Sequence, residues 1–320
     1  MRLCFLVEER YRNDGMPGEV IRQLTAWGHQ VDVVWPGSAL VRLPEAIQAG
    51  VHDAWVLKTV SGGPGLTLLE SAAAVGLTTV NDARSIRAVR DKALAAVIAH
   101  HRGLPMPRTY VVAHPESLAE LPDSEFPLVV KPADGSSGRA VHLVRSPGQL
   151  AALTTELARE GMLIAQSYVP NSGTDLKVYC VRGELFAAER RSPLQPHQSH
   201  HSDKSDQSRQ SHQPHEPLRE RRVPLSAEVA GMVRDVGRIY GLDLYGVDVL
   251  LGPDGPVIVD VNDFPSFRPV PDAVARVARA VLELAREGGT SPAPVVPLPL
   301  PLPGPVRIPV QISATPGERR

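Results

Sequence analysis

Apolar and polar residues alternate along the first third of the chain in a pattern that predicts an α/β fold. Residues 3–7 and 31–35 are short apolar runs with the length of buried strands. Residues 18–27, which lie between them, repeat apolar side chains at helical spacing. Strands that alternate with helices in this way are typical of a parallel sheet. The same pattern predicts strands at residues 54–57 and 78–80 and helices at residues 66–75 and 90–102.

The pattern changes at residues 103–107, where one glycine and two prolines break the chain. Strands predominate from residue 109 onward, so we expect an α+β unit there. Three helices are predicted within this unit, at residues 147–160, 226–240 and 271–286. The predicted strands are residues 109–112, 127–131, 140–144, 162–168, 175–181, 184–190, 244–251 and 257–262.

Two segments carry too few apolar residues to fold on their own. Residues 193–222 are crowded with Ser, Gln, His, Pro and Arg, and residues 287–320 alternate proline with small apolar residues. Neither segment can bury enough surface to offset its chain entropy, so we predict a disordered insert and a disordered Pro-rich tail. Metal binding by the insert is the alternative that its five histidines leave open, although their irregular spacing favours an unstructured loop. These histidines are His197, His200, His201, His212 and His215.

Composition narrows the class of function. Of the 320 residues, 42% are hydrophobic, which is enough for a sizeable core, and 34 basic residues nearly balance 35 acidic ones. Such a chain has no overall field to attract nucleic acid or an anionic membrane, so neither is expected as a partner. The first apolar run is too short for a signal peptide, and both cysteines, Cys4 and Cys180, lie in apolar strands. We therefore predict a cytoplasmic protein with two buried thiols rather than a disulfide.

Three oxygen-bearing side chains converge in the predicted hairpin near the end of the folded region. Residues 252–256 form a strong turn signal between two apolar strands. If Leu251 faces Val257 across this turn, Asp248 lies opposite Asp260, and strand alternation places Asn262 on the same face as Asp260. The side chains expected to point into the core from the second strand are Val257, Val259 and Val261.

Two carboxylates that face each other in an apolar setting repel, and each raises the pKa of the other unless a cation lies between them. Magnesium suits Asp248, Asp260 and Asn262, because it prefers oxygen ligands and is held by few carboxylates together with nucleotide phosphates. The alternative is a pair of solvated acids on an edge strand.

A second candidate is a basic residue followed by a small-residue loop. An apolar strand at residues 127–131 ends in Lys131, and a Gly/Ser loop and another strand follow. Backbone N–H groups in such a loop can approach phosphate closely, and the lysine adds a point charge. An ordinary strand–loop–strand hairpin is the alternative. The loop residues are Gly135, Ser136, Ser137 and Gly138.

The order of these pieces resembles the ATP-grasp superfamily, particularly the glutathione synthetase and RimK-like amino-acid ligases. The resemblance runs from about residue 90 to residue 270. It implies an ATP-grasp fold that combines α/β and α+β parts, with a Rossmann-like pre-ATP-grasp domain at residues 1–89. The ATP-grasp domain would occupy residues 90–286, with a lid at about residues 109–168.

The resemblance also implies roles for individual residues. Lys92 and Lys131 match phosphate-binding lysines, residues 134–138 match the flexible phosphate loop, and Arg190 stands at the place of a γ-phosphate arginine. The implied adenine hinge is Gln166, Ser167, Tyr168 and Val169. Asp175 and Lys177 match the G-x-D-x-R segment, with lysine in place of arginine, and Ser167 stands where an acidic residue is usual. Asp248, Asp260 and Asn262 match the metal ligands, with Asp260 where the ligases usually carry Glu.

That last departure leaves the branch open, because residues 260–265 are also similar to the D-x-N-x-F-P segment of ATP-grasp inositol polyphosphate kinases. We expect an ATP-dependent carboxylate–amine ligase that acts through an acyl phosphate, with Arg190 and Lys177 as catalytic residues. A small-molecule kinase and a non-catalytic ATP-binding module are the alternatives. The expected cofactors are ATP and Mg²⁺, with Mn²⁺ as a substitute, and the expected partner is a small-molecule or peptide acceptor. Arg268 would either face an anionic acceptor or be solvated.

Overall fold

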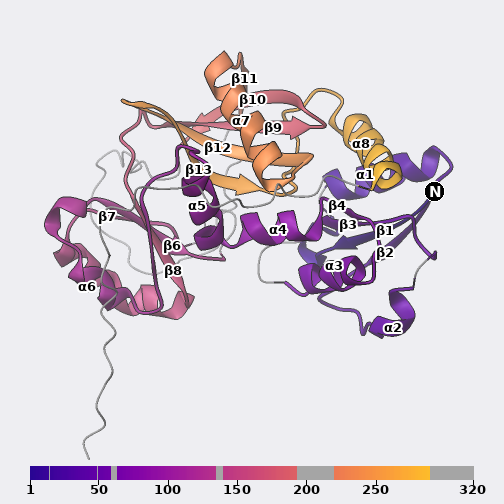
Figure 1. The fold of residues 1–320 in the computed structure, drawn as a ribbon, viewed down its shortest axis with the longest axis horizontal. Coiled ribbons are helices and arrows are strands. Elements are labelled where there is room, and N and C mark those ends of the chain that lie inside the picture. Colours follow the sequence, from indigo (N-terminus) through magenta and orange to yellow (C-terminus); the bar gives the residue numbers. More distant parts are fainter. Residues whose placement is uncertain (14, 49, 59–62, 135–139, 193–219, 289–320) are drawn as a thin grey trace, which may run out of the picture.

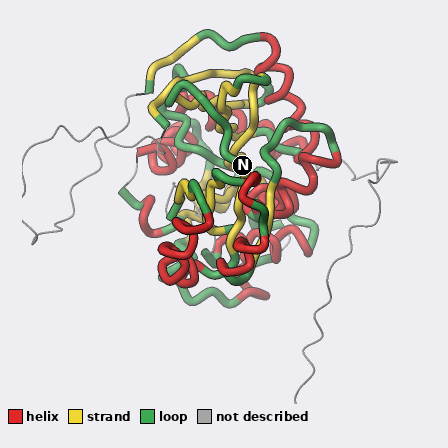
Figure 2. Tube along the Cα trace, turned by 90° about the vertical axis from the view of Figure 1, so that its left-hand side faces the viewer, coloured by secondary structure: helices red, strands yellow, loops and turns green. Residues whose placement is uncertain are grey.

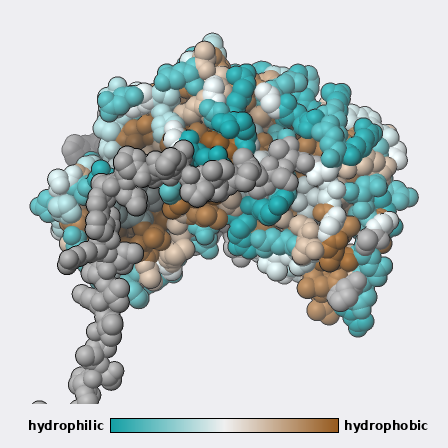
Figure 3. Space-filling model, viewed as in Figure 1, coloured by the Kyte–Doolittle hydropathy of each residue, from teal (hydrophilic) through white to brown (hydrophobic). Residues whose placement is uncertain are grey.

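The computed structural model describes the whole chain except residues 14, 49, 59–62, 135–139, 193–219 and 289–320. Its strands form three sheets that succeed one another across the molecule (Figure 1). In the perpendicular view, the strands lie mostly inside and helices surround them (Figure 2). The outline is indented between the N-terminal sheet and the sheet that packs against α6 (Figure 3).

The N-terminal sheet is parallel, with strand order β2-β1-β3-β4, as its alternation with helices predicted. Its central strand β1 is buried on both faces: Leu3 and Phe5 face α1 and α8, whereas Cys4 and Leu6 face α3. Such double burial explains why the strand reads as one apolar run. The strands are β1 (Arg2–Val7), β2 (Gln30–Val34), β3 (Ala54–Lys58) and β4 (Thr79–Val80), and the helices are α1 (Gly15–Ala26), α2 (Leu43–Ala46), α3 (Gly65–Ala74) and α4 (Ala83–Arg90).

A second sheet, antiparallel and with order β5-β8-β6-β7, covers residues of the predicted lid. One face packs against α6, whose first turn is capped by the side chain of Ser146. The elements here are α5 (Lys92–His101), β5 (Thr109–Val112), β6 (Leu128–Pro132), β7 (His142–Val144), α6 (Pro147–Leu157) and β8 (Leu163–Ser167). Short 3₁₀ turns lie at Glu9–Tyr11, Pro115–Glu120, Asp123–Glu125 and Ala158–Glu160.

The third sheet is antiparallel, with order β11-β10-β9-β12-β13, and has two chemically different faces. Val178 and Val247 point to one face and pack against α7. Their strand neighbours point to the other face, which is turned toward the N-terminal domain and the lid sheet. The elements are β9 (Thr174–Val181), β10 (Glu184–Arg191), β11 (Arg221–Val223), α7 (Ala227–Tyr240), β12 (Leu244–Gly252), β13 (Gly255–Asn262) and α8 (Ala273–Glu287).

The predicted helix at residues 90–102 is wrong at its first turn. Helix α4 ends at Arg90, and Asp91 adopts an extended conformation between two helices. The Asp91 carboxylate accepts hydrogen bonds from the N–H groups of Ala93 and Leu94, so it caps a new helix that begins at Lys92. Helices α2 and α4 were not predicted.

Parts of the two segments predicted to be disordered are ordered. Strand β11 occupies Arg221–Val223, inside the predicted insert, and pairs with β10. Helix α8 continues to Glu287, one residue into the predicted tail. Residues 193–219, with the five histidines, and residues 289–320 lie outside the described residues. Both cysteines are buried free thiols, as predicted. Within the described part of the chain, no helix combines the length and the apolar character that crossing a membrane requires.

Candidate active site

The β12–β13 hairpin places Asp248 opposite Asp260, as predicted, but through a different register. Leu251 pairs with Pro256, one residue earlier than expected. The ladder then shifts by one residue, so that Val259 forms a β-bulge. The bulge absorbs one extra residue in β13 and restores the pairing of the two carboxylates.

The bulge also changes which side chains enter the core. Ile258 and Val261 are buried among the residues under α7, whereas Val257 and Val259 are only half-buried. The prediction that residues 257 and 259 point into the core is therefore wrong, because the extra residue reverses the alternation before it. The carbonyl of Val259 accepts a hydrogen bond from Lys131 Nζ at 3.2 Å, so the irregular strand receives a cation from the lid sheet.

Asp248 lies between two cations at the centre of the sheet. Lys177 Nζ is 2.9 Å from its Oδ1, and an Arg190 nitrogen is 3.2 Å from its Oδ2. Burial opposes the charged form, but the charges of Lys177 and Arg190 outweigh it and hold the pKa of Asp248 below its usual value. The prediction that Asp260 raises this pKa is wrong, because side chains from β9 and β10 reach Asp248 first. Arg190 also forms an ion pair with Asp175 at 2.9 Å.

Two lysines approach β13 from outside the central sheet. Lys92, the first residue of α5, places Nζ 3.5 Å from Asp260 Oδ1. Lys131 comes from β6 in the lid sheet, and burial lowers its pKa, although Asp260 acts in the opposite direction. The two predicted phosphate-binding lysines therefore meet the predicted metal ligands, although residues 92 and 260 are far apart in sequence.

The candidate residues together form one charged surface. Strand register and alternation bring side chains from β9, β10, β12 and β13 to the same face of the sheet. Four cations meet three carboxylates there, which leaves one positive charge in excess and suits a polyanion that arrives with a divalent cation. The cations are Lys92, Lys131, Lys177 and Arg190, and the carboxylates are Asp175, Asp248 and Asp260.

The three predicted metal ligands offer an oxygen set that fits Mg²⁺. Among the described residues, the buried Asn262 Nδ2 atom has no hydrogen-bond partner, and exchange of the amide nitrogen and oxygen would place there an acceptor of the kind that a metal ion requires. The described residues contain no group of three His, Cys, Asp or Glu side chains that could enclose a metal ion. Two carboxylates and one amide match magnesium, which is commonly held by one or two carboxylates and completed by phosphates and water.

The predicted adenine hinge lies at the end of β8, where the lid sheet approaches the central sheet. Gln166 is buried, and its side chain donates to Thr109 Oγ1 at 3.1 Å. The N–H group of Ser167 donates to the carbonyl of Arg108, and that of Tyr168 donates to the carbonyl of Pro127. Both N–H groups are therefore already hydrogen-bonded next to the lid sheet. Val169 packs against the β12–β13 turn, since a Cβ built at Gly252 would lie 3.0 Å from Val169 Cγ1. Adenine binding by Gln166–Val169 stays a prediction, and Gly135, Ser136, Ser137 and Gly138 lie outside the described residues.

The sequence analysis did not identify the residues that hold the segment directly after β13, at residues 263–264. Asn81, at the carboxyl end of β4, donates to the carbonyls of Leu244 and Asp263 at 2.8 and 2.5 Å. Arg90 forms a buried two-point ion pair with the Asp263 carboxylate, and Lys58 donates to the Phe264 carbonyl. The sequence did offer a signal for two of these residues, because Lys58 and Asn81 are polar and lie at the ends of parallel strands. Ligand sites of α/β sheets lie at the carboxyl ends of such strands.

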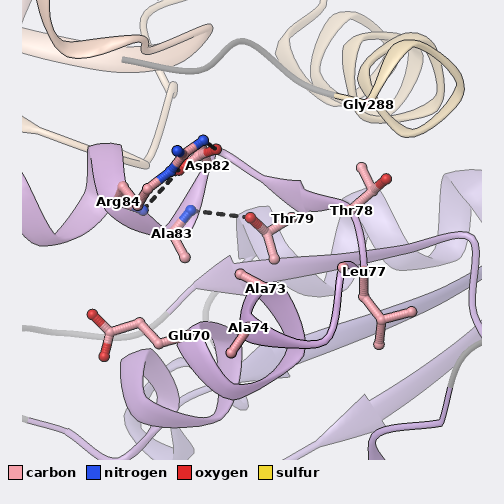
Figure 4. A pocket seen from close by; sticks show the side chains of 11 residues that line it. Glu70, Ala73, Ala74, Leu77, Thr78, Thr79, Asp82, Ala83, Arg84 and Gly288 are labelled. Carbon is pink, nitrogen blue, oxygen red and sulfur yellow. Dashed lines mark hydrogen bonds and ion pairs between the residues drawn. The ribbon is translucent and has the colours of Figure 1, made fainter. Parts of the chain in front are cut away.

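A separate pocket of about 590 Å³ lies between α3, α4 and the end of α8 (Figure 4). It contains none of the candidate residues. Its charged groups are engaged with neighbours: Arg84 with Asp82, and Glu70 with Arg87. We therefore do not assign the active site to this pocket.

Comparison with known proteins gives relatives in sequence and in fold. A probable alpha-L-glutamate ligase from Marinomonas sp. (strain MWYL1) is 23% identical over 206 residues. The alignment covers 63% of this chain and 64% of that protein, so the chain spans less than two thirds of the length of this relative. Among solved structures, a RimK domain ATP-grasp protein from Sphaerobacter thermophilus superposes with a TM-score of 0.64 at 22% identity, covering 88% of this chain and 100% of that one.

A D-alanine–D-alanine ligase from Bacillus anthracis also has a TM-score of 0.64, at 15% identity over 90% of this chain and 100% of that one. These likenesses show the ATP-grasp fold. A family model for the ATP-grasp domain of prokaryotic glutathione synthetase matches residues 97–262, about half of the chain. The matched region begins in α5, contains the lid sheet and ends at Asn262. The chain therefore belongs to the family of prokaryotic glutathione synthetase ATP-grasp domains.

Proposed function

We propose that the protein is an ATP-dependent carboxylate–amine ligase that works through an acyl phosphate. The observation that carries this proposal is the charged face of the central sheet, where Lys92, Lys131, Lys177 and Arg190 converge on the three carboxylates. A polyphosphate bound there would exchange the present ion pairs for contacts with its own oxygens. The similarity to a probable alpha-L-glutamate ligase and a D-alanine–D-alanine ligase supports a ligase over a kinase.

In the first step, an oxygen of the acceptor carboxylate attacks the γ-phosphorus of ATP. The bond between that phosphorus and the β–γ bridging oxygen breaks, ADP leaves, and an acyl phosphate remains. Arg190 and Lys177 would release Asp248 and turn to the transferring phosphate, whereas Lys92 and Lys131 would hold the β- and γ-phosphates. Positioning and charge neutralisation of this kind carry most of the catalysis in phosphoryl transfer.

In the second step, the amine nitrogen attacks the acyl carbon, the carbon–oxygen bond to phosphate breaks, and phosphate leaves as the nitrogen loses a proton. Asp248, Asp260 and Asn262 would hold Mg²⁺, or Mn²⁺ in its place. When bound, the ion would neutralise charge on the phosphates. Because the aspartates are already ion-paired, binding of the metal with ATP would redistribute the cations within the site rather than add charge to an empty one.

Hydroxylamine trapping tests this proposal. The purified protein is incubated with ATP, Mg²⁺ and a mixture of the twenty proteinogenic L-amino acids and short glutamyl peptides as carboxylates, with hydroxylamine as the nucleophile. We expect hydroxamate to form as ADP is released, because hydroxylamine captures an acyl phosphate in competition with the amines of the mixture. Formation of ADP together with a stable phosphorylated alcohol from an inositol phosphate panel would instead establish the kinase. ATP binding without ADP release under every condition would establish the non-catalytic module.

A further inference from the structure

The charged face does not end at Arg190 but continues onto the edge strand β11. Strand β11 pairs with β10 through Glu189 opposite Arg221 and Ala188 opposite Arg222. Continued by one residue, this register places Glu220 opposite Arg190, and alternation turns Glu220 and Arg222 toward the charged face. Arg221, in contrast, points to the opposite face, where it forms an ion pair with Glu189 at 2.8 Å.

A buried tyrosine fixes the carboxylate of Glu220. The Tyr179 hydroxyl, on β9, donates to both carboxylate oxygens of Glu220, at 3.3 and 3.2 Å. Tyr179 is only 1% exposed, and burial, followed by the charge of Glu220, raises its pKa, so it stays a hydrogen-bond donor. Glu220 itself is exposed on its other side. The neighbouring Arg190 forms ion pairs with Asp175 and Asp248. The result is an oriented, accessible anion one strand away from the proposed phosphate site.

The carboxylate lines a small pocket of mixed charge. The pocket has a volume of about 290 Å³, which suits one small molecule. One anionic and two cationic side chains, Glu220, Arg222 and Arg268, line it, and the segment at residues 269–271 completes the wall. A zwitterion with separated ammonium and carboxylate groups complements this arrangement, whereas a simple polyanion would be repelled by Glu220.

We propose that this pocket binds the amine substrate as an amino-acid zwitterion, with Glu220 holding the ammonium group and Arg222 and Arg268 holding the carboxylate. This inference rests on the proposed ligase function and names the class of its amine substrate. Glu220 lies opposite Arg190 in the continued β10–β11 register, so the nitrogen held there, once the ammonium group has lost a proton to solvent, is an amine beside the transferring phosphate and the acyl carbon to which it is attached. Glu220 is a specificity residue in this arrangement and Tyr179 is a positioning residue.

The test is binding of the twenty proteinogenic L-amino acids to the full chain with Mg²⁺ and a non-hydrolysable ATP analogue, followed by saturation-transfer NMR. Glu220→Gln keeps the shape of the side chain and removes its charge. Loss of a charge-assisted hydrogen bond should raise the Kd of the selected amino acid about tenfold or more. Tyr179→Phe keeps the Glu220 carboxylate but removes the hydrogen bond that orients it, so a smaller increase in Kd is expected. Glu189→Gln, on the opposite face, is the matched control and should bind as the parent does.

Hydroxylamine trapping separates this inference from the proposed function, because hydroxylamine is largely uncharged at neutral pH and needs no ammonium site. We expect the hydroxamate rate of Glu220→Gln to fall by much less than its rate with the selected amino acid, and binding of the ATP analogue shows that the variant is folded. Equal amino-acid binding by Glu220→Gln and the parent would overturn the assignment of Glu220. Hydroxamate formation by a parent that binds none of the twenty amino acids would overturn the zwitterion site while leaving the ligase in place.

Discussion

Replacement of Asp248 by asparagine should separate the electrostatic role of this residue from its role as a metal ligand. Asp248→Asn leaves Lys177 and Arg190 without their shared anion, and the Asp248 side chain is only 12% exposed. Removal of one partner from a buried ion pair costs about 3–5 kcal/mol. Asparagine still accepts one hydrogen bond, so we expect a loss near about 3 kcal/mol, which lowers Tm by roughly 6–12 °C.

Asp260→Asn is the matched comparison, because Asp260 faces Asp248 but is more exposed. It contacts Lys92 at 3.5 Å, and its side chain is 29% exposed. A pair of this kind contributes up to about 1 kcal/mol, so the metal-free Tm should fall by less than roughly 4 °C. Both variants should lower ATP turnover about 100-fold or more, because both lose a proposed ligand of the ion that neutralises the phosphates.

The assay is thermal unfolding without metal, with ATP turnover measured at saturating Mg²⁺. Asp248 has a lowered pKa, so its stabilisation is present above its ordinary value near 3.8 and is lost as the pH falls through its folded-state pKa. The stability difference between the parent and Asp248→Asn should therefore shrink below about pH 4. Equal losses of Tm in the two variants, or a difference that does not depend on pH, would refute the placement of Asp248 between two cations.

Three further predictions follow from buried groups. Lys131→Met should weaken ATP binding about tenfold or more in calorimetry. It should not lower the metal-free Tm, because burial already disfavours the charged amine and lowers its pKa. Unchanged ATP affinity would remove Lys131 from the site. Asn81→Ala should cost about 3 kcal/mol or more in urea unfolding, since its side chain makes three buried hydrogen bonds and one partly buried one. A loss below about 1 kcal/mol would show that these bonds do not hold the end of β4 to the third sheet. Burial raises the pKa of Cys4 to about 12 and also raises that of Cys180, so a thiol reagent at pH 8 should label neither cysteine until denaturant is added; rapid labelling of the native protein would contradict their burial.

Local chemistry accounts for the parts of the fold and of the candidate site that could be predicted from the sequence. The turn at residues 252–256 and strand alternation predicted Asp248 opposite Asp260, and the pairing is correct because the bulge at Val259 compensates for a register that was assumed one residue too late. Apolar runs identified the buried strands, because strands covered on both faces leave few positions for polar residues. Lys131 was recognisable because an apolar strand delivers it to a small-residue loop.

The remaining features depend on contacts between distant parts of the chain. The bulge at Val259 adds one residue to a strand without changing its composition, so the apolar pattern does not reveal it. The low pKa of Asp248 arises from cations on β9 and β10, which no local pattern places beside β12. Strand β11 is three residues long and borders a polar segment, so only its pairing with β10 defines it. The break at Asp91, in contrast, had a local signal that was overlooked, because aspartate before an apolar helix is a typical N-cap.

The most direct test of the central claim is the fate of the γ-phosphate, followed by ³¹P NMR. The purified protein turns over ATP and Mg²⁺ with a mixture of amino acids, glutamyl peptides and inositol phosphates. A carboxylate–amine ligase should convert the γ-phosphate entirely into inorganic phosphate, one for each ADP, with no release of ADP when the acceptors are left out. Accumulation of a new, stable phosphomonoester signal in place of inorganic phosphate would contradict the ligase and identify a kinase.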